Sequence, residues 1–250
     1  AFTLGCAVSA TLAVAGHPIL AIPAAMIAGA LAGFVTAFLQ TKMKIPSILA
    51  GIITNTGLYT VNLAVMGFSS NVNMLKSATV FTMVKPLLGT FYRLIPGALI
   101  AAVAALLLIA FLRTRLGLSI RATGDNPDMV RASSINTAFT VTVGLCVANA
   151  LTALSGAVLA QYQRTADINL GTGMVIIGLA SLIIGDTLTP KGRVHTKILG
   201  ALAGSVIYRF IIAIALRLDL PSECLKLISA VIVALAIGLP ALGGEKKGVA

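Results

Sequence analysis

Residues 94–112 read LIPGALIAAVAALLLIAFL, an unbroken apolar run with no charged side chain. A helix needs about 20 apolar residues to cross about 30 Å of hydrocarbon, so this run is predicted to span a membrane. Comparable apolar runs occupy residues 2–15, 18–39, 46–66, 138–160, 174–188, 197–216 and 224–242.

The composition agrees with lipid as the solvent for most of the chain. Of its 250 residues, 58% are hydrophobic and 10% are charged, and the mean hydropathy is +1.02. Soluble domains carry about one quarter charged residues, so a soluble globule of this size is excluded. Backbone groups in lipid must be satisfied within a segment, and no run alternates with a period of two. We therefore expect an all-α fold, a polytopic transmembrane helical bundle with about eight membrane segments.

Two runs are short for a complete span. Residues 2–15 and 174–188 are predicted to be broken or re-entrant helices that line a protein-enclosed cavity, or, for the first, a helix that begins before the sequence given. A G-x-x-x-G pair at Gly29 and Gly33 predicts close helix packing. Cys6, Cys146 and Cys224 are widely separated within or beside apolar runs, so they are expected to be small core residues rather than disulfide or metal ligands.

The net charge of +11 does not indicate nucleic-acid binding, because the basic residues lie between the apolar runs. They concentrate in the loop at residues 113–137, which contains Arg113, Arg115, Arg121 and Arg131. By the positive-inside rule we expect this loop to be cytoplasmic.

The loop at 113–137 is also expected to contain a short helix over about residues 127–134. Asp125 or Asn126 is able to cap its free N–H groups, Pro127 suits the first helical position, and Asp128 complements the positive end of the helix. A docking surface and an ordinary solvated loop both fit this composition.

Polar residues form stripes on two predicted spans. Asn55, Tyr59 and Asn62 recur at helical spacing on one span. Thr142, Asn149 and Thr152 share a face of another, together with Gly156. Amides are costly in hydrocarbon unless they are paired or face water, so both stripes are candidates for a translocation path. Hydrogen bonding between helices is the alternative.

Arg209 is the one charge well inside a predicted span, where it would contact an anionic substrate group or support a broken helix. Every acidic residue lies in a loop or at a helix end, which disfavours a proton-driven transporter. The sequence contains no P-loop and no metal or serine-hydrolase motif. We therefore expect no catalytic residue and no metal site in this chain.

The string IRATGDNPDMVRASSINT at residues 120–137 resembles the cytoplasmic loop of permease subunits of bacterial ABC importers, in the branched-chain amino acid and sugar permease superfamily. The pattern of that family is roughly R-A-x-G-x-N-P-x-x-A/V-R-x-x-G-I-N. GLASLIIGD at 178–186 and GSVIYRFIIAIALRLDLPSECLKLISAVIV at 204–233 are similar to its amino-acid-like branch. The resemblance covers about residues 20–242.

In that family the short helix of this loop is the coupling helix, which sits in a cleft of the ATPase subunit. The resemblance implies that the following residues couple to an ATPase: Arg121, Gly124, Asp125, Asn126, Pro127, Asp128, Met129, Val130 and Arg131. Ser134 occupies a position where the family usually has Gly, so the exit turn of the helix is the part that the resemblance does not predict.

The resemblance also implies a single transmembrane permease domain over residues 1–250, in the bacterial cytoplasmic (inner) membrane. It would work as a dimer, expected to be a homodimer, with cytoplasmic ABC ATPase subunits and an extracytoplasmic substrate-binding protein. ATP and Mg²⁺ would be used by the ATPases, and this chain would bind no cofactor. The solute is expected to be an amino acid. The outward loops at 67–92 and 161–173, with Arg164, Asp167 and Asn169, would contact the binding protein.

Two other classes remain open at this point. A stand-alone channel or facilitator for a small polar solute would also use polar stripes, but it needs neither a capped loop helix nor an ATPase. An integral membrane enzyme needs convergent acid, base or metal residues at membrane depth, and the sequence offers none.

Overall fold

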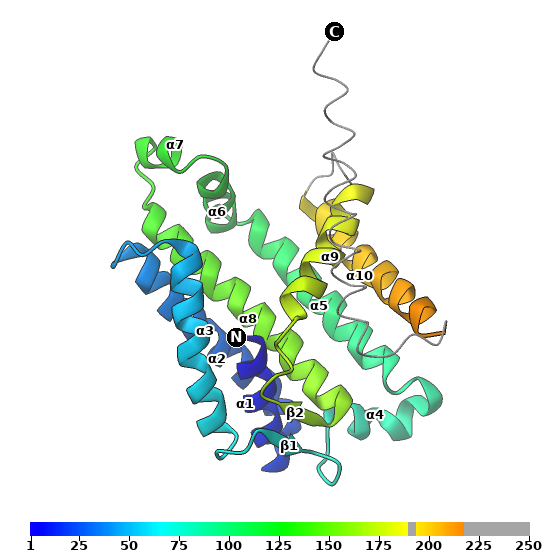
Figure 1. Cartoon of the computed structure of the whole chain (residues 1–250). Helices are drawn as coiled ribbons and strands as arrows, with labels where there is room; N and C mark the ends of the chain where they lie inside the picture. Colours follow the sequence, from blue (N-terminus) through cyan, green and yellow to red (C-terminus); the bar gives the residue numbers. More distant parts are fainter. Residues whose placement is uncertain (190–193, 218–250) are drawn as a thin grey trace. The chain divides into compact units, whose positions relative to one another are not determined.

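The computed structural model describes residues 1–189 and 194–217, and the regular structure within them is almost entirely helical (Figure 1). In chain order, its elements are α1 (Phe2–Val14), α2 (Pro18–Thr41), α3 (Ser47–Val65), β1 (Asn71–Asn73), α4 (Val80–Leu88), the 3₁₀ turn η1 (Gly89–Phe91), α5 (Leu94–Arg113), α6 (Arg115–Asp125), α7 (Pro127–Ala132), α8 (Thr137–Gln163), β2 (Thr165–Asp167), α9 (Met174–Leu188) and α10 (Val194–Arg217). The described residues fall into two compact units, which divide between Gly171 and Thr172.

Five of the described helices are long and apolar enough to cross a membrane, namely α2, α3, α5, α8 and α10. The run at 94–112 forms α5, and its mean hydropathy of 2.7 is the highest of the five. The runs at 2–15 and 174–188 form the shorter helices α1 and α9. The run at 224–242 lies outside the described residues. The expectation of a polytopic helical membrane protein is confirmed.

In the first unit, α8 packs along α2 through small residues. A Cβ atom added to Gly29 would lie 2.5 Å from the carbonyl oxygen of Asn149, and one added to Gly33 would lie 2.5 Å from that of Leu145. Such distances exclude any side chain, so the two helix backbones are in close contact at these glycines. The G-x-x-x-G pair therefore performs the packing role predicted from the sequence.

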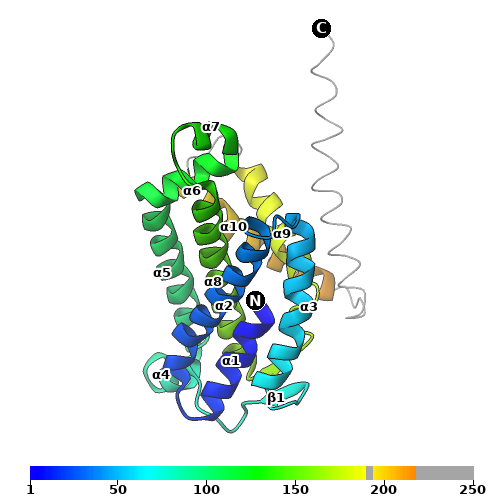
Figure 2. The same ribbon diagram turned by 90° about the vertical axis from the view of Figure 1, so that its left-hand side faces the viewer.

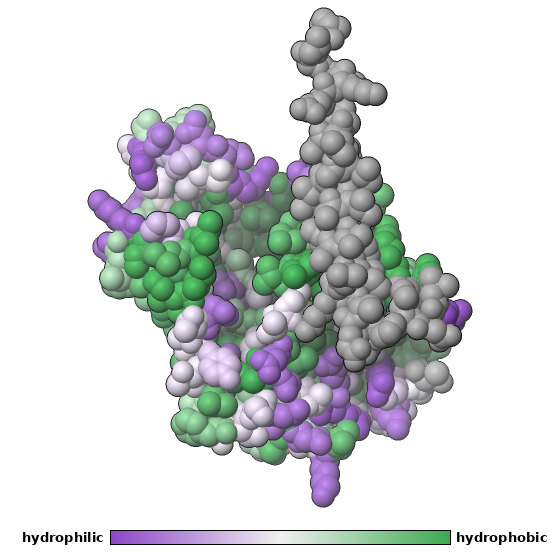
Figure 3. Space-filling view, viewed as in Figure 1, coloured by the Kyte–Doolittle hydropathy of each residue, from purple (hydrophilic) through white to green (hydrophobic). Residues whose placement is uncertain are grey.

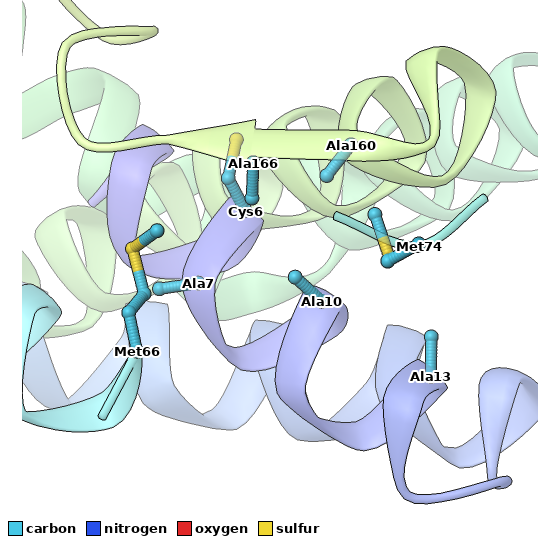
Figure 4. Packing of buried hydrophobic residues seen from close by; sticks show 8 residues of the cluster. All are labelled: Cys6, Ala7, Ala10, Ala13, Met66, Met74, Ala160 and Ala166. Carbon is cyan, nitrogen blue, oxygen red and sulfur yellow. The ribbon is translucent and has the colours of Figure 1, made fainter. Parts of the chain in front are cut away.

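Small and sulfur-containing side chains also fill the contact of α1 with its neighbours. The cluster consists of Cys6, Ala7, Ala10, Ala13, Met66, Met74, Ala160 and Ala166 (Figure 4). The thiol of Cys6 donates a hydrogen bond of 3.2 Å to the carbonyl oxygen of Gly156 on α8. Cys6 is therefore a core residue as predicted, Cys146 is half-buried, and Cys224 lies outside the described residues.

The described part of the second unit is the α9–α10 pair. A Cβ atom added to Gly204 of α10 would lie 2.6 Å from the backbone nitrogen of Gly185 of α9, so these helices also meet backbone to backbone. Near the connection between them, Lys197 Nζ lies 3.1 Å from a carboxylate oxygen of Asp186. Both side chains are more than half exposed, so this ion pair contributes little to stability.

The first unit has two polar ends. α6 and α7 lie at one end, while α4 and β1 lie at the other (Figures 1 and 2). On the face seen in the space-filling view, hydrophilic residues gather at the end formed by α6 and α7 and again at the opposite end, and an apolar patch lies between them, next to α6 and α7 (Figure 3). Apolar surface between two polar ends is expected of a protein that crosses a bilayer.

Candidate functional site

The loop at 113–137 is built from two helices rather than one. The sequence analysis did not predict α6, which begins directly after α5. The Thr114 hydroxyl caps it by accepting a 3.2 Å hydrogen bond from the backbone N–H of Gly117. A Cβ atom added to Gly117 would lie 2.5 Å from the Cα atom of Leu112. Glycine at this position therefore permits the sharp turn from α5 into α6. The hydroxyl of Thr114, a residue type that favours helix starts, was the sequence signal that could have predicted the beginning of α6.

The predicted short helix is confirmed as α7, although it ends at Ala132 rather than at residue 134. Asn126 is its cap, since its side-chain oxygen accepts hydrogen bonds of 3.1 Å from the N–H groups of Asp128 and Met129. Asp125, the other candidate cap, is the last residue of α6. Arg121, Gly124 and Asp125 thus lie on α6, and the remaining predicted coupling residues lie on or before α7.

The exit turn of α7 has left-handed backbone geometry. Ser134 has a φ of 60°, a conformation that glycine adopts more readily than serine. This explains physically why glycine suits the position that Ser134 occupies. The side chain of Arg131 spans the turn, because its Nε donates a 3.2 Å hydrogen bond to the Thr137 hydroxyl and its guanidinium pairs with Asp128 at 3.3 Å.

The stripe on α3 is divided between exposed and buried positions. Asn55 and Tyr59 are exposed, and Tyr59 retains 53% of its accessible surface. Asn62 is 5% exposed, and its side-chain oxygen has no hydrogen-bond partner among the described residues. The neighbouring Thr54, which the sequence analysis did not single out, is buried and accepts a 3.0 Å hydrogen bond from Thr36 of α2.

The polar side chains of the stripe on α8 are satisfied within their own helix. The hydroxyls of Thr142 and Thr152 donate to the carbonyls of Ala138 and Ala148, both at 2.8 Å. The Asn149 amide donates to the Leu145 carbonyl at 2.9 Å, on the side of α8 that packs against α2. A role of this stripe in translocation remains a prediction.

The loops at 67–92 and 161–173 meet in a short antiparallel ribbon, which the sequence did not predict. β1 pairs with β2 in the register Asn71 to Asp167, Val72 to Ala166 and Asn73 to Thr165. Arg164 precedes β2 in left-handed geometry, with a φ of 58°. The carboxylate of Asp167 accepts a 2.7 Å hydrogen bond from the N–H of Asn169. Arg164, Asp167 and Asn169, which are predicted to contact a binding protein, therefore lie in β2 or within two residues of it, at one end of the unit (Figure 1).

Gln161 joins the same end of α8 to three other elements. Its Nε2 donates to the hydroxyl of Ser9 at 3.1 Å and to the carbonyl of Pro18 at 3.0 Å, and its Oε1 accepts from the N–H of Val80 at 2.9 Å. The side chain is 1% exposed. The sequence analysis missed this residue, although a glutamine directly after an apolar run was a visible signal.

Arg209 lies in the second unit, on the exposed wall of a pocket between α9 and α10. The pocket has a volume of about 480 Å³ and includes Ser181 and Ser205 in its lining. Arg209 lies within the continuous helix α10, and its role stays a prediction.

Apolar helices of membrane-spanning length, close packing through small residues and a polar loop folded into capped helices define a polytopic helical membrane protein. The chain belongs to the family described as branched-chain amino acid transport system, permease component, which matches residues 1–238. It is therefore a multi-pass integral protein of the bacterial inner membrane and a permease component of a transport system.

Individual relatives agree with this family. The chain is 34% identical over 233 residues to the tyrosine transport system permease protein of Clostridioides difficile, covering 93% of this chain and 77% of the relative. It is 24% identical over 238 residues to the ribose import permease protein of Haemophilus influenzae, covering 91% and 70%. It is 29% identical over 201 residues to an inner membrane ABC transporter permease protein of Escherichia coli, covering 76% and 57%. No solved structure matches the chain significantly.

Proposed function

We propose that this chain is the permease subunit of an ATP-driven ABC importer for an amino acid. Two copies would form the translocation path, cytoplasmic ATPases would use ATP and Mg²⁺, and an extracytoplasmic binding protein would deliver the solute. The observation that carries the proposal is the loop at 113–137, because its two capped helices are attached to the neighbouring spans at defined points.

The attachment of the loop supports a role in transmitting movement. α6 continues from α5 through the tight turn at Gly117, and Thr123 of α6 is hydrogen-bonded to Thr140 of α8 across a distance of 2.9 Å. Within α7, Val130 is 2% exposed whereas Met129 is 61% exposed. A rigid-body displacement of α7 would therefore be passed to two spans, while its exposed face remains available to an ATPase.

The solute class is inferred from the relatives. The relative with 34% identity is named for tyrosine transport, whereas the relative named for ribose import has 24% identity. An amino acid, and an aromatic one in particular, is therefore the solute to test first. Arg164, Asp167 and Asn169 are the proposed contacts for the binding protein.

The test is reconstitution with a candidate ATPase and binding protein in liposomes, with ATP-dependent uptake of tyrosine and of ribose as the readouts. Asn126→Ala/Pro127→Ala should reduce ATPase co-purification or uncouple ATP hydrolysis from uptake. Lys42→Ala, in the connection between α2 and α3, is the matched control and should behave as wild type. Solute flux through the chain alone, without ATPase or ATP, would overturn the proposal in favour of a channel.

A further inference from the structure

The amphipathic helix α4 is anchored at its first turn to the end of α8. Thr79 and Thr82 form a reciprocal capping box, in which the N–H of Thr79 donates to the Thr82 hydroxyl at 2.7 Å and the N–H of Thr82 donates to the Thr79 hydroxyl at 3.2 Å. Phe81 is 4% exposed and meets the ring of Tyr162 edge to face, at 5.9 Å between centroids. The start of α4 is therefore held in place, and the residues that follow it are presented at the surface.

Two basic side chains, Lys85 and Arg93, contact tyrosine rings beside α4. The guanidinium carbon of Arg93 lies 5.4 Å from the ring centroid of Tyr92 and 5.5 Å from that of Tyr162. The ammonium of Lys85 lies 5.7 Å from the Tyr92 ring centroid. Cation–π contacts orient these charges without neutralising them. Among the described residues, no carboxylate lies within ion-pair distance of either cation.

The position of the cluster in the chain places it at the membrane surface. Arg93 immediately precedes α5, which is the most apolar of the described spans. The surface around the cluster is apolar, since Met83, Phe91 and Leu94 are 45%, 60% and 67% exposed. Tyrosines and basic residues at the end of a span lie at the level of the lipid headgroups. Exposure of these three apolar side chains to water is unfavourable, whereas contact with lipid acyl chains would bury them.

We propose that Lys85, Tyr92, Arg93 and Tyr162 form a binding site for the phosphate of an anionic phospholipid headgroup. Arg93 supplies a planar set of N–H donors suited to two phosphate oxygens, and Lys85 adds a second positive charge. Met83, Phe91 and Leu94 contact the upper part of the acyl chains. An acidic surface of a soluble protein would match the charges but would leave these apolar side chains uncovered, so charge and hydropathy together favour a lipid.

The test compares retention of phosphatidylglycerol and phosphatidylcholine by the purified 250-residue chain, using native mass spectrometry in detergent. Wild type should retain phosphatidylglycerol preferentially. Arg93→Gln and Lys85→Gln should each weaken that retention about fivefold, in keeping with the contribution of one basic residue near an anionic surface. Lys76→Gln is the matched control, because Lys76 is an exposed lysine of the same connection outside the cluster.

Tyr162→Leu should also weaken the retention of phosphatidylglycerol, whereas Tyr162→Phe should retain the ring and the lipid. Circular dichroism of each variant separates loss of lipid from loss of fold. Equal retention of the two lipids by wild type, or an equal effect of Lys76→Gln, would overturn the proposal. An unchanged preference for phosphatidylglycerol in Arg93→Gln and Lys85→Gln would also overturn it. The readout requires neither an ATPase nor transport, so it is independent of the proposed function.

Discussion

The hydroxyl oxygens of Thr123 and Thr140 lie 2.9 Å apart in a buried hydrogen bond between α6 and α8. Each hydroxyl also lies within reach of a carbonyl of its own helix, Thr123 to Ser119 at 2.7 Å and Thr140 to Thr137 at 2.9 Å. Because a hydroxyl has one proton, one threonine donates to the other while the second donates to its own helix. This pair is the direct polar link between the first helix of the loop and the span that follows it.

Thr123→Val and Thr140→Val should therefore show thermodynamic coupling. Each single substitution leaves a buried hydroxyl with one partner fewer, so we expect a loss of about 1 kcal/mol in the free energy of unfolding. The double variant should lose less than the sum of the two. Denaturant unfolding in detergent provides the measurement. Thr187→Val is the control, because the Thr187 hydroxyl donates only to a carbonyl of its own helix. Strict additivity would contradict the link.

Ser134→Gly should stabilise the exit turn of α7. A serine at a φ of 60° carries strain of about 1 kcal/mol that glycine avoids, which exceeds the entropic cost of glycine in the unfolded chain. Hydrogen exchange of the amides from Met129 to Ile135 should slow. Ser133→Gly is the contrasting variant, since Ser133 has a φ of −84° and glycine brings no relief there. Faster exchange in Ser134→Gly would show that the turn is not strained.

The sequence predicted the helical class and the position of each described apolar run, because lipid imposes length and hydropathy on every span. It also predicted α7, because Asn126 and Pro127 are local signals that act within one turn of helix. α6 was not predicted. Its stability depends on contacts of Gly117 and Thr123 with α5 and α8, and such contacts leave no periodic pattern in a short polar segment.

The candidate site shows the same division between local and distant information. Helical spacing placed Asn55 and Asn62 on one face but could not reveal that only Asn62 is buried, because burial depends on how α3 lies against α1 and α2. The hydrogen bonds of Gln161 to α1, α2 and α4 were equally inaccessible, since they connect residues separated by as many as 152 positions.

Gly29→Ala should disrupt the contact of α2 with α8. The new Cβ would lie 2.5 Å from the carbonyl oxygen of Asn149, so the helices must separate and lose packing along their length. Overpacking of this kind costs about 1–3 kcal/mol. Gly51→Ala is the matched control in another apolar helix, because nothing lies within 4 Å of its added Cβ. Thermal unfolding in detergent should show a lower midpoint for Gly29→Ala alone. Equal midpoints for the two variants would argue against close packing at Gly29.

Asn62→Leu separates a structural from a transport role for the stripe on α3. The Asn62 oxygen is buried without a partner among the described residues, so replacing the amide with an apolar group of similar size removes an uncompensated acceptor. An unsatisfied buried polar group costs about 1–3 kcal/mol, and we therefore expect the variant to unfold at an equal or higher denaturant concentration than wild type. An asparagine that served only the fold would be expected to have its buried side-chain oxygen hydrogen-bonded. If Asn62 instead lines the translocation path, the same variant should lose most of its ATP-dependent amino-acid uptake while remaining folded.

Thr54→Val provides the comparison, since the Thr54 hydroxyl is bonded to Thr36 and its loss should reduce stability. Full uptake by a stabilised Asn62→Leu variant would remove Asn62 from the path.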